Sequence, residues 1–211
     1  MGAGSGLGMR RVFVALAPTL ELARELRDAV EPVLAEDSGW RLPAASHIHL
    51  TLAFLGDIAE KRLPELEEIV AEATRGRPAP RLLVRGTGAF PDWPRPKVLW
   101  LGVAEAPGSE RHLFELQEAI AEGLRLARMR FDDKGVFVPH LTVARPARRT
   151  RRGARDAAPS DGHAAPALET FRHLSVERPW TPDAVLSIES RLGAPSPKRY
   201  PVLARHPLEG S

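Results

Sequence analysis

The chain has 211 residues, of which 43% are hydrophobic and 27% are charged, so it is apolar enough to fold and long enough to bury a sizeable core. Cysteine is absent, which excludes disulfides and thiolate metal sites. Thirty lysines and arginines against 27 aspartates and glutamates leave a net charge of only +3, which argues against a protein that coats nucleic acid. The positions of the seven histidines carry most of the remaining chemical information.

The amino-terminal residues 1–8 are rich in glycine, and we expect them to form a flexible leader. A secretory signal would need a longer apolar stretch than residues 12–16, which Pro18 soon follows. No apolar run approaches the ~18 residues needed to cross a bilayer. We therefore expect a cytoplasmic protein that does not contact membranes.

Runs of β-branched and aromatic residues predict strands, and apolar residues three or four apart predict helices. In chain order, the expected elements are a strand at 11–17, a helix at 19–35 with Thr19 as its N-cap, a strand at 47–55, a helix at 63–73, strands at 81–87 and 97–103, a helix at 109–127, and strands at 136–144, 184–191 and 200–205. Residues 146–166 are rich in Arg, Gly, Ala and Pro and are expected to form a mobile insertion.

One four-residue motif occurs twice. His49-Leu50-Thr51-Leu52 corresponds to His140-Leu141-Thr142-Val143, and the two histidines are 91 residues apart. A predicted strand and a predicted helix precede each copy in the same order. Repetition of both the motif and the element order indicates an α+β fold of two related lobes, intertwined in one domain at 10–208.

Alternate side chains of a strand point to the same face. His49 and Thr51 therefore share one face, and His140 and Thr142 do the same, while their apolar neighbours pack under the helices. If the lobes are related by a pseudo-two-fold axis, two imidazoles and two hydroxyls meet across a cleft. One neutral histidine can then accept a proton from an attacking water while the other donates a proton to the departing oxygen on phosphorus. The threonines can hold the non-bridging oxygens, and this chemistry needs neither a metal nor another cofactor.

The sixth residue of each repeated segment differs, being Phe54 in the first and Arg145 in the second. An arginine can clamp a phosphate, and an aromatic ring can stack on a base. Strict alternation would place both on the apolar face. This is improbable for an arginine, so we expect the second strand to end or bulge near Ala144. Phe54 fits either the core or a substrate contact.

Two other features have alternative interpretations. His47 and His49 share a strand face and could form a metal pair, but no third ligand lies nearby, so we expect His47 at the rim of the cleft and no metal site. Six arginines lie between residues 145 and 155. Such a run is usually a solvated loop, although it could also follow an RNA backbone.

The segments H-L-T-L-A-F-L-G, P-H-L-T-V-A-R and E-S-R-L-G followed by R-Y-P-V-L-A-R resemble the RNA 2′,3′-cyclic phosphodiesterases. These belong to the two-histidine phosphoesterase superfamily and are also called 2′-5′ RNA ligases. The similarity runs from about residue 10 to residue 208. It implies a bilobal fold with two antiparallel sheets around a central cleft and helices outside.

The resemblance also implies an activity, which is hydrolysis of a terminal 2′,3′-cyclic phosphate of RNA to a 2′-phosphomonoester. His49 would be the proton donor to the leaving 3′ oxygen, and His140 the acceptor that activates water. Thr51, Thr142 and Arg145 match the phosphate-binding positions of the family, and Phe54 matches a position of substrate contact.

Several alternatives remain open from the sequence. The same site could act on 2′-5′ oligonucleotides or on small cyclic nucleotide phosphates, or catalyse reversible 2′-5′ RNA ligation. A non-catalytic module that binds RNA ends is a different class of function. In each case the expected partner is an RNA or oligonucleotide end, and we expect the protein to be a monomer.

Overall fold

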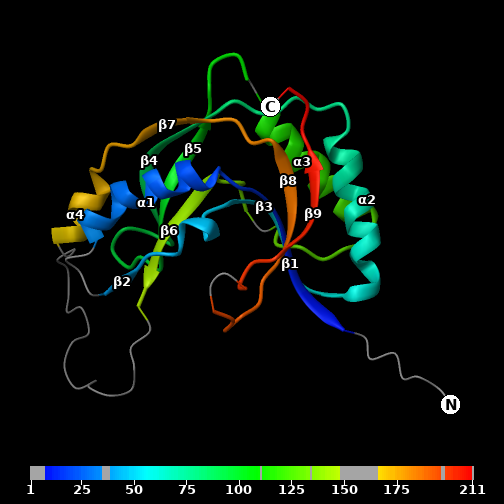
Figure 1. Cartoon of the computed structure of the whole chain (residues 1–211), viewed down its shortest axis with the longest axis horizontal. Helices are drawn as coiled ribbons and strands as arrows, with labels where there is room; N and C mark the ends of the chain where they lie inside the picture. Colours follow the sequence, from blue (N-terminus) through cyan, green and yellow to red (C-terminus); the bar gives the residue numbers. More distant parts are fainter. Residues whose placement is uncertain are drawn as a thin grey trace.

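The computed structural model describes residues 8–34, 39–109, 111–133, 135–147, 166–195 and 198–210 (Figure 1). The strands are β1 (Met9–Leu16), β2 (Trp40–Arg41), β3 (Leu50–Ala59), β4 (Leu82–Phe90), β5 (Val98–Glu105), β6 (His140–Pro146), β7 (Glu177–Trp180), β8 (Ala184–Glu189) and β9 (Val202–Pro207). The helices are α1 (Leu20–Leu34), α2 (Leu63–Thr74), α3 (His112–Leu126) and α4 (Pro166–Arg172), with 3₁₀ turns η1 (Ala45–His47) and η2 (Glu60–Arg62). None of these helices is long and apolar enough to cross a membrane.

The described strands form one antiparallel sheet in the order β7-β4-β5-β6-β3-β1-β8-β9, with β2 added to β6. The strand that precedes each motif in the sequence pairs with the motif strand, since β1 pairs with β3 and β5 pairs with β6. Between β3 and β6 the registered pair is Leu50 with Leu141. The α+β class is confirmed, and the two predicted sheets are the halves of one sheet joined at this pair.

The main hydrophobic core lies between the helices and one face of the sheet. Its strand residues include the apolar positions of both motifs, Leu50, Leu52, Leu141 and Val143, each at most 3% exposed. The helices contribute an apolar stripe each, such as Leu26 and Val30 from α1. The prediction that this face of the motif strands packs under helices is confirmed, and the His/Thr face is therefore the other one.

The four helices are divided between the two halves of the sheet. α1 packs against α4, and α4 also contacts β4, whereas α2 packs against α3 and contacts β8 and β9 (Figure 1). α1 begins as predicted, because the Oγ1 atom of Thr19 accepts a hydrogen bond from the backbone N–H of Leu22 at 3.2 Å. α3 also contacts β3, the first motif strand.

Some element boundaries differ from the prediction. The strand expected at 47–55 is wrong at both ends, because residues 45–47 form η1 and β3 continues to Ala59. His49 precedes the first residue of β3. β2, α4 and β7 were not predicted as elements. The expected leader at 1–8 and the expected insertion at 146–166 lie largely outside the described residues.

Candidate active site

A cavity of about 430 Å³ opens on the face of the sheet that carries the motif histidines. Its lining includes all six residues predicted from the sequence, which are His49, Thr51, Phe54, His140, Thr142 and Arg145. Other lining residues were not predicted, among them Phe13, Arg41, Ser190, Arg199 and Tyr200. Residues that are far apart in the chain therefore meet in one site.

The two motif histidines are held in the same local geometry. The Nδ1 atom of His49 lies 2.8 Å from the carbonyl oxygen of His47, and the Nδ1 atom of His140 lies 2.7 Å from the carbonyl oxygen of Val138. A carbonyl only accepts hydrogen bonds, so Nδ1–H is the donor in both rings. The Nε2 atom of each imidazole is thereby left as the nitrogen that can take or give a proton.

Aromatic side chains from two distant segments of the chain pack against the ring of His49. Its centroid lies 4.6 Å from that of Phe13 on β1 and 5.6 Å from that of Tyr200, which precedes β9. Tyr200 also packs edge-on against His47 at 4.8 Å. His47 lines the cavity, as expected for a rim residue. These contacts restrict the orientation of His49 and partly desolvate it.

His140 has a corresponding aromatic wall from β4 and β5. Its centroid lies 5.0 Å from that of Phe90 and 5.9 Å from that of Trp100. The indole of Trp100 lies over Gly88, where a Cβ atom would be only 2.0 Å from the ring. A glycine at this position therefore lets the tryptophan lie flat on the sheet beside the histidine.

Burial changes the acid–base properties of both histidines. The pKa of His49 is lowered to about 4, mainly by burial, with smaller contributions in the same direction from the charges of Arg145 and His140, while the bond to the carbonyl of His47 opposes the shift. Burial also lowers the pKa of His140, again with help from Arg145 and against the bond to Val138. Near pH 7 the free protein therefore holds two neutral imidazoles that share an arginine.

Phe54 and Arg145 reach the cavity because each motif strand has a register irregularity at the same position. Between β1 and β3 the register shifts so that Leu52 is skipped, and between β5 and β6 it shifts so that Val143 is skipped. One extra residue reverses the alternation beyond it. The expected bulge near Ala144 is confirmed, and Phe54 lies on the cavity face, with the Arg11 guanidinium 4.8 Å from its ring centroid.

The lining of the cavity is cationic. Arg41, Arg145 and Arg199 line it together with three histidines, and no Asp or Glu of the described residues does so. The described part of the chain also contains no cluster of three His, Asp or Glu side chains suited to a metal ion. This arrangement favours a bound anion and offers a divalent cation few oxygen ligands.

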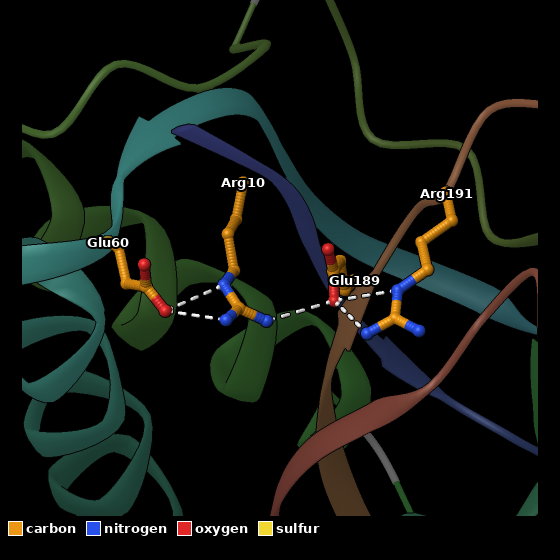
Figure 2. Close-up of polar contacts among 4 residues, drawn as sticks. All are labelled: Arg10, Glu60, Glu189 and Arg191. Atoms are coloured by element: carbon orange, nitrogen blue, oxygen red, sulfur yellow. Dashed lines mark hydrogen bonds and ion pairs between the residues drawn. The ribbon is translucent and has the colours of Figure 1, made fainter. Parts of the chain in front are cut away.

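A salt-bridge network lies at the end of β8 (Figure 2). The residue that follows β8, Ser190, lines the cavity. Glu189 accepts hydrogen bonds from Arg10 at 3.2 Å and from Arg191 at 3.0 and 3.1 Å, all through Oε2. Arg10 also binds Glu60, just after β3. The network thus joins the ends of β1, β3 and β8 where the segment leading to Tyr200 departs.

The unpredicted lining residues gave little signal in the sequence. Arg199 and Tyr200 stand in the carboxyl-terminal run that resembles the family, but nothing local connects them with His49. β8 lies beside β1, which lies beside β3. This strand order brings Arg199 and Tyr200 close to His49. Phe13 could have been found by period-two alternation within β1, because its neighbours Val12 and Val14 belong to the main core.

Comparison with known proteins gives a consistent result. The LigT-like phosphoesterase family matches residues 16–100. A Thermotoga maritima protein named RNA 2′,3′-cyclic phosphodiesterase is 30% identical over 135 residues, covering 64% of this chain and 69% of the relative. An Archaeoglobus fulgidus protein of the same name is 35% identical over 138 residues, covering 64% and 72%.

Solved structures share the fold along nearly the whole chain. The structure of TT0787 from Thermus thermophilus has a TM-score of 0.67 at 27% identity, covering 95% of this chain and 98% of that one. E. coli LigT in complex with 3′-AMP has the same fold, with a TM-score of 0.64 at 22% identity and coverage of 96% and 99%. The matched sequence and the antiparallel fold are thus those of a phosphoesterase. The chain belongs to the LigT-like phosphoesterase family.

Proposed function

We propose that the protein hydrolyses the 2′,3′-cyclic phosphate at the end of an RNA to a 2′-phosphomonoester. The observation that carries this proposal is the pair of imidazoles that share one cationic cavity, each with Nδ1 bound to a carbonyl and Nε2 available. The names of the Thermotoga and Archaeoglobus relatives support the substrate class.

The anion is bound by groups that remain on the cavity face of the two motif strands. Thr51 and Thr142 donate hydroxyl hydrogen bonds to the non-bridging phosphate oxygens, and Arg145 offsets the charge that these oxygens carry in the transition state. Phe54 contacts the terminal nucleoside. Because the cavity walls are partly aromatic and the site is partly desolvated, these contacts are stronger than in bulk water.

The reaction is a displacement at phosphorus with one proton transfer on each side. The Nε2 atom of His140 takes a proton from water as the water oxygen bonds to phosphorus. The bond from phosphorus to the 3′ oxygen breaks, and the Nε2–H of His49 gives that oxygen its proton. The phosphate stays on the 2′ oxygen, and exchange of protons with solvent restores both imidazoles. The assignment of donor and acceptor is supported by the family resemblance of the two motifs.

Binding of the substrate supplies the protonated histidine that this mechanism needs. In the free protein, burial lowers the pKa of both imidazoles. A bound phosphodiester places a negative charge beside them, which favours the imidazolium form and raises the pKa. The proton donor is therefore charged mainly when substrate is present. The mechanism uses no metal or other cofactor, in line with the cationic lining of the cavity.

The deciding experiment uses a defined oligonucleotide that ends in a 2′,3′-cyclic phosphate, with the product identified by chromatography against 2′- and 3′-phosphate standards. We expect the 2′-phosphomonoester, formed at the same rate with and without EDTA. A 3′-phosphate product would overturn the assigned leaving oxygen. Binding without turnover would instead support a module that only holds RNA ends.

The remaining alternatives differ in substrate and are tested in the same assay. Parallel reactions with a 2′-5′-linked oligonucleotide and with a nucleoside 2′,3′-cyclic phosphate give the preferred class. Adding an RNA with a 5′-hydroxyl end tests 2′-5′ ligation, in which that hydroxyl replaces water as the nucleophile. We also propose that residues 10–208 act as one bilobal domain in a cytoplasmic monomer.

A further inference from the structure

Two arginines lie directly opposite each other where β2 pairs with β6. Arg41 and Arg145 are partners in this antiparallel pair, and both are exposed and line the cavity. Opposed side chains in such a pair share a face, with Cβ atoms about 5 Å apart, and like charges in this position repel each other. A bound anion would relieve that repulsion.

Arg41 is held in this position by the backbone and by its neighbour. Trp40 packs against the main core, so alternation directs Arg41 to the opposite, cavity side. The backbone N–H of Ala147 donates a hydrogen bond to the carbonyl of Gly39 at 2.9 Å, which extends the pairing of β2 with β6. The guanidinium is thus on a fixed part of the cavity wall.

No carboxylate of the described residues forms an ion pair with Arg41 or Arg145. By contrast, Arg10 and Arg191 both bind Glu189, the last residue of β8. A bound anion can therefore balance the positive charge of Arg41. A 2′,3′-cyclic phosphate carries one negative charge, whereas three arginines of the described residues line the cavity.

The two opposed arginines differ in their effect on the reacting centre. In addition to burial, the charge of Arg145 lowers the pKa of both His49 and His140, whereas Arg41 contributes to neither shift. Arg145 therefore acts on the imidazoles more strongly than Arg41 does. When the terminal phosphate of an RNA lies at the histidines, the rest of the RNA must pass along some part of the cavity wall.

We propose that Arg41 binds the phosphodiester that joins the terminal nucleotide to the rest of the RNA. The site then selects an oligonucleotide end over a free nucleoside 2′,3′-cyclic phosphate. This inference rests on the proposed function and assigns its substrate class. A guanidinium suits the task, because its planar N–H groups can bind two oxygens of one phosphate.

The test compares kcat/KM for a dinucleotide and a mononucleoside, both ending in a 2′,3′-cyclic phosphate. In Arg41→Ala we expect the dinucleotide-to-mononucleoside ratio to fall on the order of tenfold. Arg24→Ala, which removes an exposed arginine of α1 outside the cavity, should leave the ratio unchanged. Thermal unfolding of each variant checks that the fold is retained.

A dinucleotide with a neutral methylphosphonate linkage isolates the charge. The wild type should lose its preference for this dinucleotide, and Arg41→Ala should have no further effect on the ratio. An unchanged ratio for the ordinary dinucleotide in Arg41→Ala, or an equal loss with both linkages, would overturn the assignment of Arg41. Absence of hydrolysis of both substrates by the wild type would instead overturn the proposed function.

Discussion

Leu50 on β3 is paired with Leu141 on β6 at the junction of the two halves of the sheet. In an antiparallel register this pair places His49 beside Thr142 and His140 beside Thr51. The paired leucines point into the core, so the four polar side chains point away from it. A repeated H-x-T segment therefore makes a symmetric site when its two copies pair through their central residues.

The first prediction concerns the two histidines of this pair. His49→Ala and His140→Ala should each lower kcat/KM for an RNA ending in a 2′,3′-cyclic phosphate by about 10²–10⁴-fold, because each removes one proton-transfer group. His173→Ala is a matched control, since His173 is exposed and its side chain binds only Glu169 among the described residues. Full activity in either motif variant would refute the paired-histidine mechanism.

The second prediction separates the proton donor from the acceptor. A substrate with sulfur in place of the 3′ bridging oxygen has a leaving thiolate that needs no proton, because thiols ionise near pH 8.5. His49→Ala should therefore recover most of its lost rate on the sulfur substrate, while His140→Ala should remain slow. The rates are followed by release of the thiol. Recovery in His140→Ala instead would show that the two roles are reversed.

The third prediction concerns the pH dependence of the rate. One histidine must be protonated and the other neutral, so both kcat and kcat/KM should give bell-shaped profiles. Because burial lowers the pKa of His49 to about 4 and also lowers that of His140, the bell of kcat/KM should lie below pH 6.5. The bound anion raises both pKa values, so the bell of kcat should lie at higher pH. Profiles displaced in the opposite order would contradict this account.

Much of the site follows from the sequence, because the period of a strand is two and the motif is repeated. Alternation predicts that Leu50 and His49 lie on opposite faces. The improbability of a buried arginine predicts the bulge beyond Thr142. The extent of β3 could not be predicted, because its pairing with β1 contains two register shifts. A register shift depends on the partner strand, so it cannot be predicted from the sequence of one strand alone.

The contacts of Tyr200 illustrate a second limit. Its ring packs against His47 and His49, which lie about 150 residues earlier in the chain. This contact depends on the position of β1 between β3 and β8, and therefore on the order of the whole sheet. Local patterns predict most of the elements, whereas the order in which they pair is a property of the complete fold.

The fourth prediction links the buried histidine to stability. Unfolded histidine titrates near pH 6.5, whereas burial lowers the pKa of folded His49 to about 4, so the unfolded chain binds more protons between these values. The free energy of unfolding should therefore fall as the pH drops from about 6.5 to 4, by on the order of 3 kcal/mol or less from this residue. Denaturant unfolding at pH 7 and 4.5 measures the change. His49→Gln should reduce the pH dependence, and an equally steep dependence in that variant would assign it to other groups.

The fifth prediction concerns Glu189, which connects Arg10 with Arg191 (Figure 2). Its side chain is only 13% exposed, so Glu189→Gln removes a carboxylate from between two guanidiniums and should destabilise the fold by about 1–3 kcal/mol. The segment that begins at Ser190 should then hold Tyr200 less firmly against His49, which lowers kcat more than it raises KM. The matched control is Asp183→Asn, which removes the exposed partner of Arg205 at the far end of β8. If both variants lose the same stability and neither changes kcat, the network supports the fold without positioning the histidine.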